Sequence, residues 1–109
     1  MAQSIRVLYL RQQGVNRKNF NWPPVKLDSP VIITAAEFQT AFGGPMGGPK
    51  TLGRPHLGDA SVYVTNVGPH GAGNEAGGVE FSLHVDWDSP LDVIVTITVL
   101  EDIEEFFQA

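Results

Sequence analysis

The sequence predicts a mainly β protein, a single-domain antiparallel β-sandwich or open barrel with one short capped helix and long Gly/Pro loops. Three observations favour this class. Several segments alternate apolar and polar residues, the connections between them are rich in glycine and proline, and one segment alone carries a helix signature. A chain of 109 residues suits one domain, so we expect residues 1–109 to form a single β domain.

The N-terminal third predicts two strands joined by a polar connection. Residues 5–10 alternate in the manner of a strand with one buried face. Residues 14–27 predict a connection, because Pro23 and Pro24 cannot donate to the ladder of an interior strand. Residues 31–34 are β-branched throughout and predict a short buried strand.

A capping box predicts the helix. The Thr34 hydroxyl can accept from the backbone N–H of Glu37, and the Glu37 carboxylate can reach back to Thr34. Phe38 and Phe42 then share one face at a spacing of one helical turn. We therefore expect a helix over about residues 35–42.

Residues 43–59 resemble a phosphate-binding loop in their glycine content but lack its chemistry. Such a loop requires glycine and lysine side by side, and Pro49 separates Gly48 from Lys50. Pro45 and Pro49 also lack the N–H groups that would cradle a phosphate. We expect a long surface loop with no affinity for nucleotides.

The second half of the chain carries the clearest strands. Residues 61–67 and 79–87 alternate, and residues 91–100 form a long apolar strand. The expected buried face of the middle segment consists of Val79, Phe81, Leu83, Val85 and Trp87.

The outward face of the last strand points to self-assembly. Charged residues would be typical of a solvated face, whereas this one is apolar or hydroxylated, and the acidic-aromatic tail 102–109 follows it. We predict a non-enzymatic assembly or protein-interaction module that forms a homo-oligomer, most simply a dimer. The expected interface residues are Ile94, Thr96, Thr98, Leu100, Phe106 and Phe107.

Two other functions stay open. A lectin-like domain binding carbohydrate or another small ligand would use two tryptophans flanked by amides or carboxylates. Those candidate ligand-binding residues are Asn19, Asn21, Trp22, Asp86, Trp87 and Asp88. A small metal-dependent enzyme would use His84 and Asp86, which share one side of a strand, although no recognisable metal-ligand spacing accompanies them.

Charge and composition bear on partners and location. The net charge is −5, which makes a nucleic-acid partner unlikely. Five basic and no acidic residues precede Asp28, whereas nine acidic and no basic residues follow from Glu75 onward, so the two ends of the chain should attract each other. We expect no cofactor, no catalytic residue and no membrane association. We also expect a cytoplasmic protein, since there is no signal peptide and no cysteine.

Overall fold

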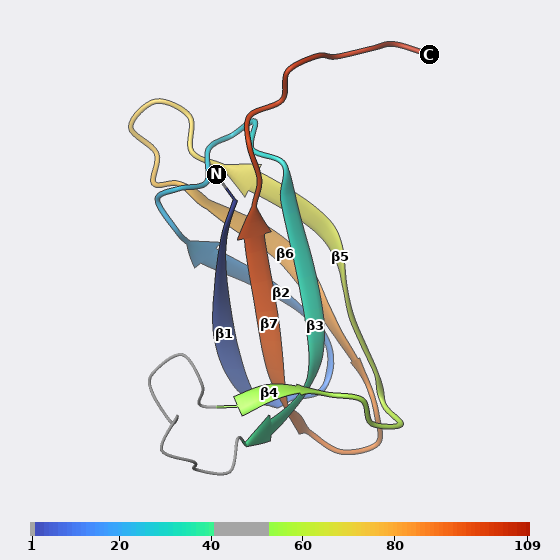
Figure 1. Ribbon diagram of the computed structural model, residues 1–109. Helices are drawn as coiled ribbons and strands as arrows, with labels where there is room; N and C mark the ends of the chain where they lie inside the picture. The colour runs from blue at the N-terminus through green and yellow to red at the C-terminus, as the bar shows by residue number, and fades with distance from the viewer. Residues whose placement is uncertain (1, 41–52) are drawn as a thin grey trace.

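A computed structural model describes residues 2–40 and 53–109, which form two antiparallel sheets and contain no helix (Figure 1). The mainly β prediction is therefore confirmed. Because the described residues include no helix, they also include none that could cross a membrane. The strands are β1 (Gln3–Gln12), β2 (Gly14–Asn21), β3 (Val31–Thr40), β4 (Gly53–His56), β5 (Ser61–His70), β6 (Gly78–Asp86) and β7 (Leu91–Val99).

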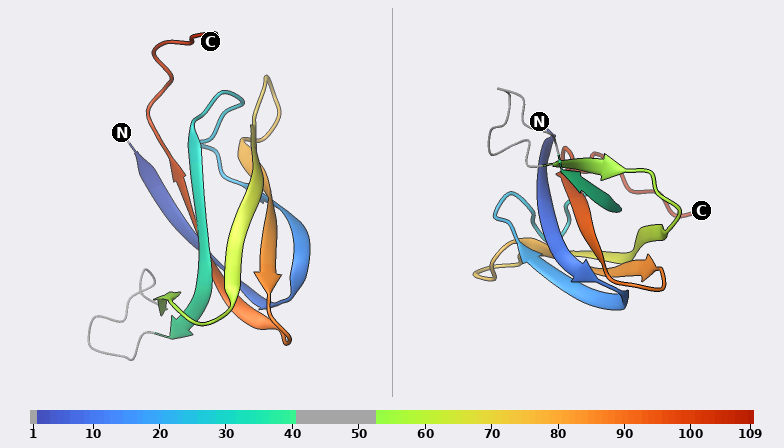
Figure 2. Two further views of the ribbon diagram at one scale, coloured as in Figure 1. Left: turned by 90° about the vertical axis from the view of Figure 1, so that its right-hand side faces the viewer. Right: turned by 90° about the horizontal axis from the view of Figure 1, so that it is seen from below.

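The chain crosses between the two sheets four times. The first, called the β7 sheet, has the order β1-β7-β3-β4, and the second, called the β6 sheet, has the order β2-β6-β5. The chain leaves β1 and enters β2, in the opposite sheet, through the single residue Gln13. Toward its C-terminal end β3 curls, and β4 runs beside it across that end of the sheet (Figures 1 and 2).

The core lies between the central strands of the two sheets. β6 and β7 alternate as the sequence predicts, and their inward side chains form one buried cluster. This cluster contains Val79, Phe81, Leu83 and Val85 from β6 and Val93, Val95 and Ile97 from β7. Trp87 was expected to continue the buried face of β6, but β6 ends at Asp86 and Trp87 is 42% exposed.

The predicted helix is wrong, because residues 31–40 form strand β3. The capping-box residue Thr34 lies opposite Thr96 of β7, and Ala36 lies opposite Ile94. A two-turn helix is marginal by itself, whereas this segment gains a continuous ladder with β7 and packs Ile33 against the core. Tertiary pairing therefore overrides the local helix signal. Residues 41 and 42 lie outside the described residues.

The polar connection expected over residues 14–27 is largely a strand. β2 pairs with β6 along its whole length, from Gly14 opposite Val85 to Asn21 opposite Gly78. It alternates between exposed and half-buried positions, but the half-buried positions include Asn16 and Lys18, so its hydrophobic pattern is weak. An edge strand such as β2 tolerates this composition. Pro23 and Pro24 come after β2 has ended at Asn21, so they do not interrupt its pairing.

The long loop expected over residues 43–59 contains a short strand. β4 pairs with the end of β3, and Pro55 lies opposite Phe38. Gly53 is buried directly against the Phe38 ring, at a position where a β-carbon would collide with that ring. The phosphate-loop signature and its two prolines, Pro45 and Pro49, lie outside the described residues.

Candidate functional site

The outer face of the β7 sheet is the surface on which the assembly prediction depends. It is formed by β1, β7 and β3, whose residues lie side by side in rows across the sheet. We call it the outer β7 face. Its residues are Ser4, Arg6 and Leu8 from β1, Asp92, Ile94, Thr96 and Thr98 from β7, and Ile32, Thr34 and Ala36 from β3.

Hydroxyl and aliphatic side chains dominate the outer β7 face. Ser4 Oγ lies 2.7 Å from Thr98 Oγ1, and Arg6 Nε donates to Thr96 Oγ1 over 3.1 Å. Among the residues that define the face, Arg6 and Asp92 alone are charged. The hydroxyls of Ser4, Thr96 and Thr98 are engaged within the face itself, and the exposed aliphatic side chains beside them meet solvent.

Not every predicted interface residue is available on this surface. Ile94 is only 5% exposed, because it lies in the central strand between Leu8 and Ala36. Ile32 is 54% exposed, although the sequence placed it in a buried strand. Leu100 continues the face beyond β7, where its N–H donates to the Pro30 carbonyl over 3.0 Å. The exposed apolar area therefore comes mainly from β1, β3 and Leu100.

The C-terminal tail presents its aromatic residues to solvent. Residues 100–109 are exposed and form no strand, and they extend away from the two sheets (Figure 1). Phe106 is 92% exposed and Phe107 is 82% exposed. Two exposed phenylalanines on an extended segment are typical of anchors for a partner.

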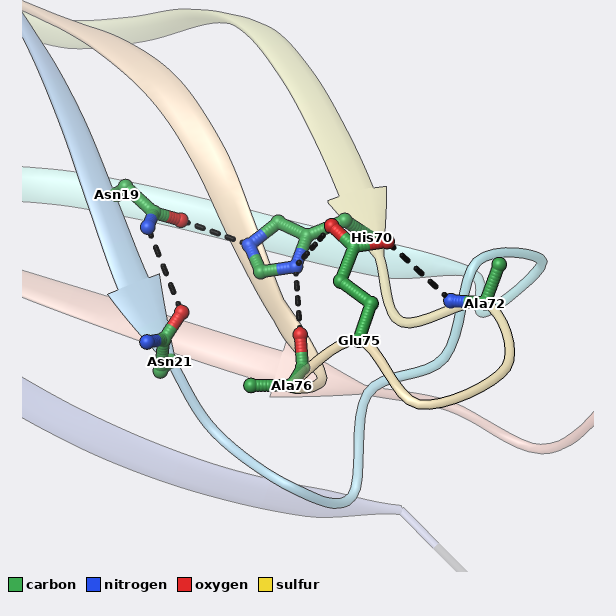
Figure 3. A network of polar contacts seen from close by, with 6 residues as sticks. All are labelled: Asn19, Asn21, His70, Ala72, Glu75 and Ala76. Carbon is green, nitrogen blue, oxygen red and sulfur yellow. Dashed lines mark hydrogen bonds and ion pairs between the residues drawn. The ribbon is translucent and has the colours of Figure 1, made fainter.

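Asn19 and Asn21 of β2 belong to a polar network that includes the end of β5 and the loop after it (Figure 3). His70 Nε2 lies 2.7 Å from Asn19 Oδ1, and Asn19 Nδ2 donates to Asn21 Oδ1 over 3.4 Å. The backbone N–H of Trp22 donates to the Gly77 carbonyl over 2.7 Å, and the Trp22 side chain packs against the core cluster.

The loop between β5 and β6 closes this network (Figure 3). His70 Nδ1 lies 2.8 Å from the Ala76 carbonyl oxygen and 3.5 Å from Glu75 Oε1. Glu75 Oε2 also accepts from the Ala72 N–H over 3.4 Å. The amides proposed as sugar ligands thus contact the protein's own side chains, Asn19 with His70 and Asn21 with Asn19. Sequence reasoning did not predict the contact between His70 and Asn19, because nothing local indicates a partner 51 residues away.

The two tryptophan motifs do not form one site. Asn21, next to Trp22, pairs with Gly78 at the start of β6, whereas Asp86, next to Trp87, ends that strand. Nine residues of strand span about 30 Å, so the motifs lie at opposite ends of the sheet. One small ligand therefore cannot contact both motifs. Asp86, Trp87 and Asp88 form a candidate site that is separate from Asn19, Asn21 and Trp22.

Asp86 and His84 line a shallow groove on the outer face of the β6 sheet. The groove has a volume of about 180 Å³ and is lined by Gly14, Val15, Tyr63, His84, Val85 and Asp86. The Tyr63 and His84 rings stack with their centroids 4.4 Å apart, and His84 Nε2 lies 2.7 Å from Thr65 Oγ1. Sequence reasoning missed Tyr63, although its alternation places it on the same side as His84.

The structure brings no third metal ligand to His84 and Asp86. Within residues 2–40 and 53–109, no group of three or more histidine, aspartate and glutamate side chains could hold a metal ion. His84 Nε2 is also already within hydrogen-bonding distance of Thr65.

The charge asymmetry of the sequence is partly satisfied inside one copy. β1, which carries Arg6 and Arg11, pairs with β7, where Asp92 Oδ1 accepts from the backbone N–H of Arg11 over 2.9 Å. β2 pairs with β6, and Arg17 lies 3.6 Å from Glu80. The carboxylates of the tail lie beyond these paired strands.

Comparisons with protein-family models, with curated proteins and with solved structures find no match to this chain. The function must therefore be argued from the surfaces themselves.

Proposed function

We propose that this protein is a non-enzymatic assembly module that forms a homo-oligomer through the outer β7 face. The supporting observation is the contrast between three adjacent strands of exposed aliphatic and hydroxyl residues and only two charged side chains among them. Burying the exposed Ile32, Leu8 and Leu100 side chains would remove apolar area from water, at about 25 cal/mol for each Å².

A second copy of the same chain suits this surface because its two charges are complementary to each other. Arg6 and Asp92 lie on opposite sides of the Leu8–Ile94 pair. A two-fold axis passing by that pair can place Arg6 of each copy opposite Asp92 of the other. The same operation brings the aliphatic residues of the two copies together, as a self-complementary dimer contact requires.

The test is a matched pair of lysine substitutions. Thr96 and Ser82 occupy equivalent places, at the middle of the outer face of a central strand, and each lies opposite an arginine on the neighbouring edge strand. Thr96→Lys puts an unpaired ammonium in the middle of the proposed contact, where burial is costly. Ser82→Lys makes the same change on the outer face of the β6 sheet.

Light scattering after size exclusion should show a homo-oligomer for the parent protein and for Ser82→Lys, and a folded species of lower mass for Thr96→Lys. Circular dichroism checks that both variants retain the β spectrum. A parent protein that is monomeric at high concentration would refute self-assembly. Dissociation by both variants, or by neither, would show that the contact does not involve the outer β7 face.

A second candidate function is supported by the groove on the β6 sheet. Tyr63 offers an exposed aromatic ring, Val15 an apolar wall and Asp86 a carboxylate, and these groups suit the C–H face and hydroxyls of a sugar ring. Trp87 follows Asp86 directly and is partly exposed, so its fluorescence should report binding. Titration with a panel of monosaccharides tests this candidate, and Tyr63→Ala should abolish any saturable change.

A further inference from the structure

The two sheets are closed on one side and open on the other. β3 and β5 run close together on the closed side (Figure 2). On the open side, β1 and β2 diverge from their corner at Gln13 (Figure 2). Within the described residues, β1 is hydrogen-bonded only to β7, and β2 only to β6. The free edge of β1 can therefore accept another strand.

The side chains beside the free edge of β1 combine aromatic, aliphatic and basic groups. Lys18 of β2 places its Nζ 5.0 Å from the centre of the Tyr9 ring, and that ring meets Phe81 edge-on with centroids 6.5 Å apart. Burial raises the pKa of the Tyr9 hydroxyl above its ordinary value of 10.0. In the part of the chain that the structure describes, Lys18 makes no ion pair with a carboxylate.

The two sides of β1 differ in character. Ile5, Val7 and Tyr9 point inward and pack against the core, whereas Arg6 and Leu8 point outward. A strand added at this edge would continue both sides. Its inward side should be apolar with an acidic group near Lys18, and its outward side should offer an acidic group and an apolar group.

The C-terminal tail has this pattern. When residues 101–109 are extended, Ile103, Glu105 and Phe107 point to one side, and Glu104 and Phe106 point to the other. The first side places a carboxylate between two apolar residues, and the second pairs a carboxylate with an aromatic ring. Nine extended residues span about 30 Å, which matches the ten residues of β1.

We propose that residues 101–109 of one copy bind as an additional strand at the free edge of β1 in a second copy. Ile103 and Phe107 then cover the inward side of the edge, and Glu105 lies beside Val7, on the side of β1 where the Lys18 ammonium lies over Tyr9. On the outward side, Glu104 meets Arg6, and Phe106 packs beside Leu8. Main-chain hydrogen bonds supply affinity, and the alternating side chains supply specificity.

This contact is head-to-tail, and it rests on the proposed self-assembly. Each copy offers one tail and one free edge, so contacts of this kind close into a ring or continue as a chain of copies. The contact through the outer β7 face is instead symmetric, with the same residues on both sides. The two contacts therefore respond differently to mixtures of variants.

A mixing experiment with full-length variants tests the head-to-tail contact. The tail variant Ile103→Asp/Phe107→Asp keeps a normal β1 edge, and the edge variant Lys18→Glu keeps a normal tail. All of these chains also carry Thr96→Lys, which removes the symmetric contact, and Thr96→Lys alone serves as their parent. Each variant should associate at least about tenfold more weakly than that parent, as expected for the loss of anchor residues. An equimolar mixture should form a dimer with the parent affinity, because one intact tail then meets one intact edge.

A charge exchange sharpens the test. Lys18→Glu combined with Glu105→Lys in one chain should restore assembly to within a few-fold of the parent. Light scattering gives the mass, and circular dichroism confirms that each variant is folded. The proposal is overturned if the tail variant assembles like the parent, or if the mixture is no larger than either variant alone. If Thr96→Lys leaves the mass unchanged while the tail variant dissociates, the symmetric contact is refuted and the head-to-tail contact stands.

Discussion

The outer faces of the two sheets differ in how their side chains are paired. On the β6 sheet, charged and polar side chains find partners within the face, since Arg17 lies 3.6 Å from Glu80 and His84 lies 2.7 Å from Thr65. On the β7 sheet, short hydroxyls and exposed aliphatic residues cover three neighbouring strands. The first face exposes Val15 and Tyr63 at its groove beside these paired groups, whereas the second leaves apolar area that a second copy can cover.

The largest expected effect comes from the core that both faces share. Phe81 is fully buried and contacts Tyr9 across the two sheets. Phe81→Ala should lower the free energy of unfolding by about 3–5 kcal/mol. Urea unfolding followed by circular dichroism measures this loss, and a single transition would show that the two sheets unfold together.

Trp87→Ala is the control for that prediction, because the sequence expected the same buried environment for Trp87 as for Phe81. Since Trp87 is exposed beyond the end of β6, its loss should lower the free energy of unfolding by about 1 kcal/mol or less. A loss as large as that of Phe81→Ala would contradict the exposed position.

The next effect separates buried from exposed residues on the outer β7 face. Ile94→Ala should cost about 2–5 kcal/mol, since Ile94 is buried within one copy. Ile32→Ala should cost less than about 1 kcal/mol, a value typical of exposed strand positions. Unfolding at dilute protein concentration measures both losses without a contribution from assembly, and equal losses would contradict the difference in burial.

A smaller effect is expected on the outer face of the β6 sheet. Glu80→Gln removes the exposed ion pair with Arg17 and should cost about 0.2–1 kcal/mol. Salt screens exposed charges, so the difference between variant and parent should shrink at an ionic strength of about 1 M. A larger cost that persists in high salt would show that this pair is not solvated.

The smallest expected effect distinguishes the strand from the helix that the sequence predicted. In β3, Thr34→Val keeps a β-branched side chain at an exposed position, so stability should change by no more than about 0.5 kcal/mol. At a helix N-cap the same change would remove a hydrogen bond and cost about 1 kcal/mol. Thermal unfolding resolves the two outcomes.

The elements that the sequence predicts well are those whose own residues determine them. β6 and β7 alternate strictly, and the structure confirms their boundaries to within a residue or two. β2 could not be predicted in this way, because Asn16 and Lys18 occupy its inward positions and its pairing with β6 decides the structure. The helix prediction failed for the related reason that Thr34 and Glu37 satisfy a local rule that pairing with β7 overrides.

The candidate surfaces could likewise be predicted only in part from local sequence patterns. The alternation of β7 predicts which residues point outward, but it cannot show that Ile94 is covered by its neighbours on β1 and β3. The contact of His70 with Asn19 likewise joins residues 51 positions apart. Such contacts depend on strand order, which no local pattern in this chain specifies.

The pairing of the first strand with the last has a consequence during synthesis on the ribosome. Ser4 lies opposite Thr98, so β1 emerges long before its only described hydrogen-bonded neighbour has been translated. β3 also depends on β7, whereas β2, β5 and β6 are all available once residue 86 has emerged. The β6 sheet can thus form on the nascent chain, while the β7 sheet must wait for its central strand. Because these long-range contacts close late, folding should be slow, and the edge of β1 should need protection by chaperones until translation ends.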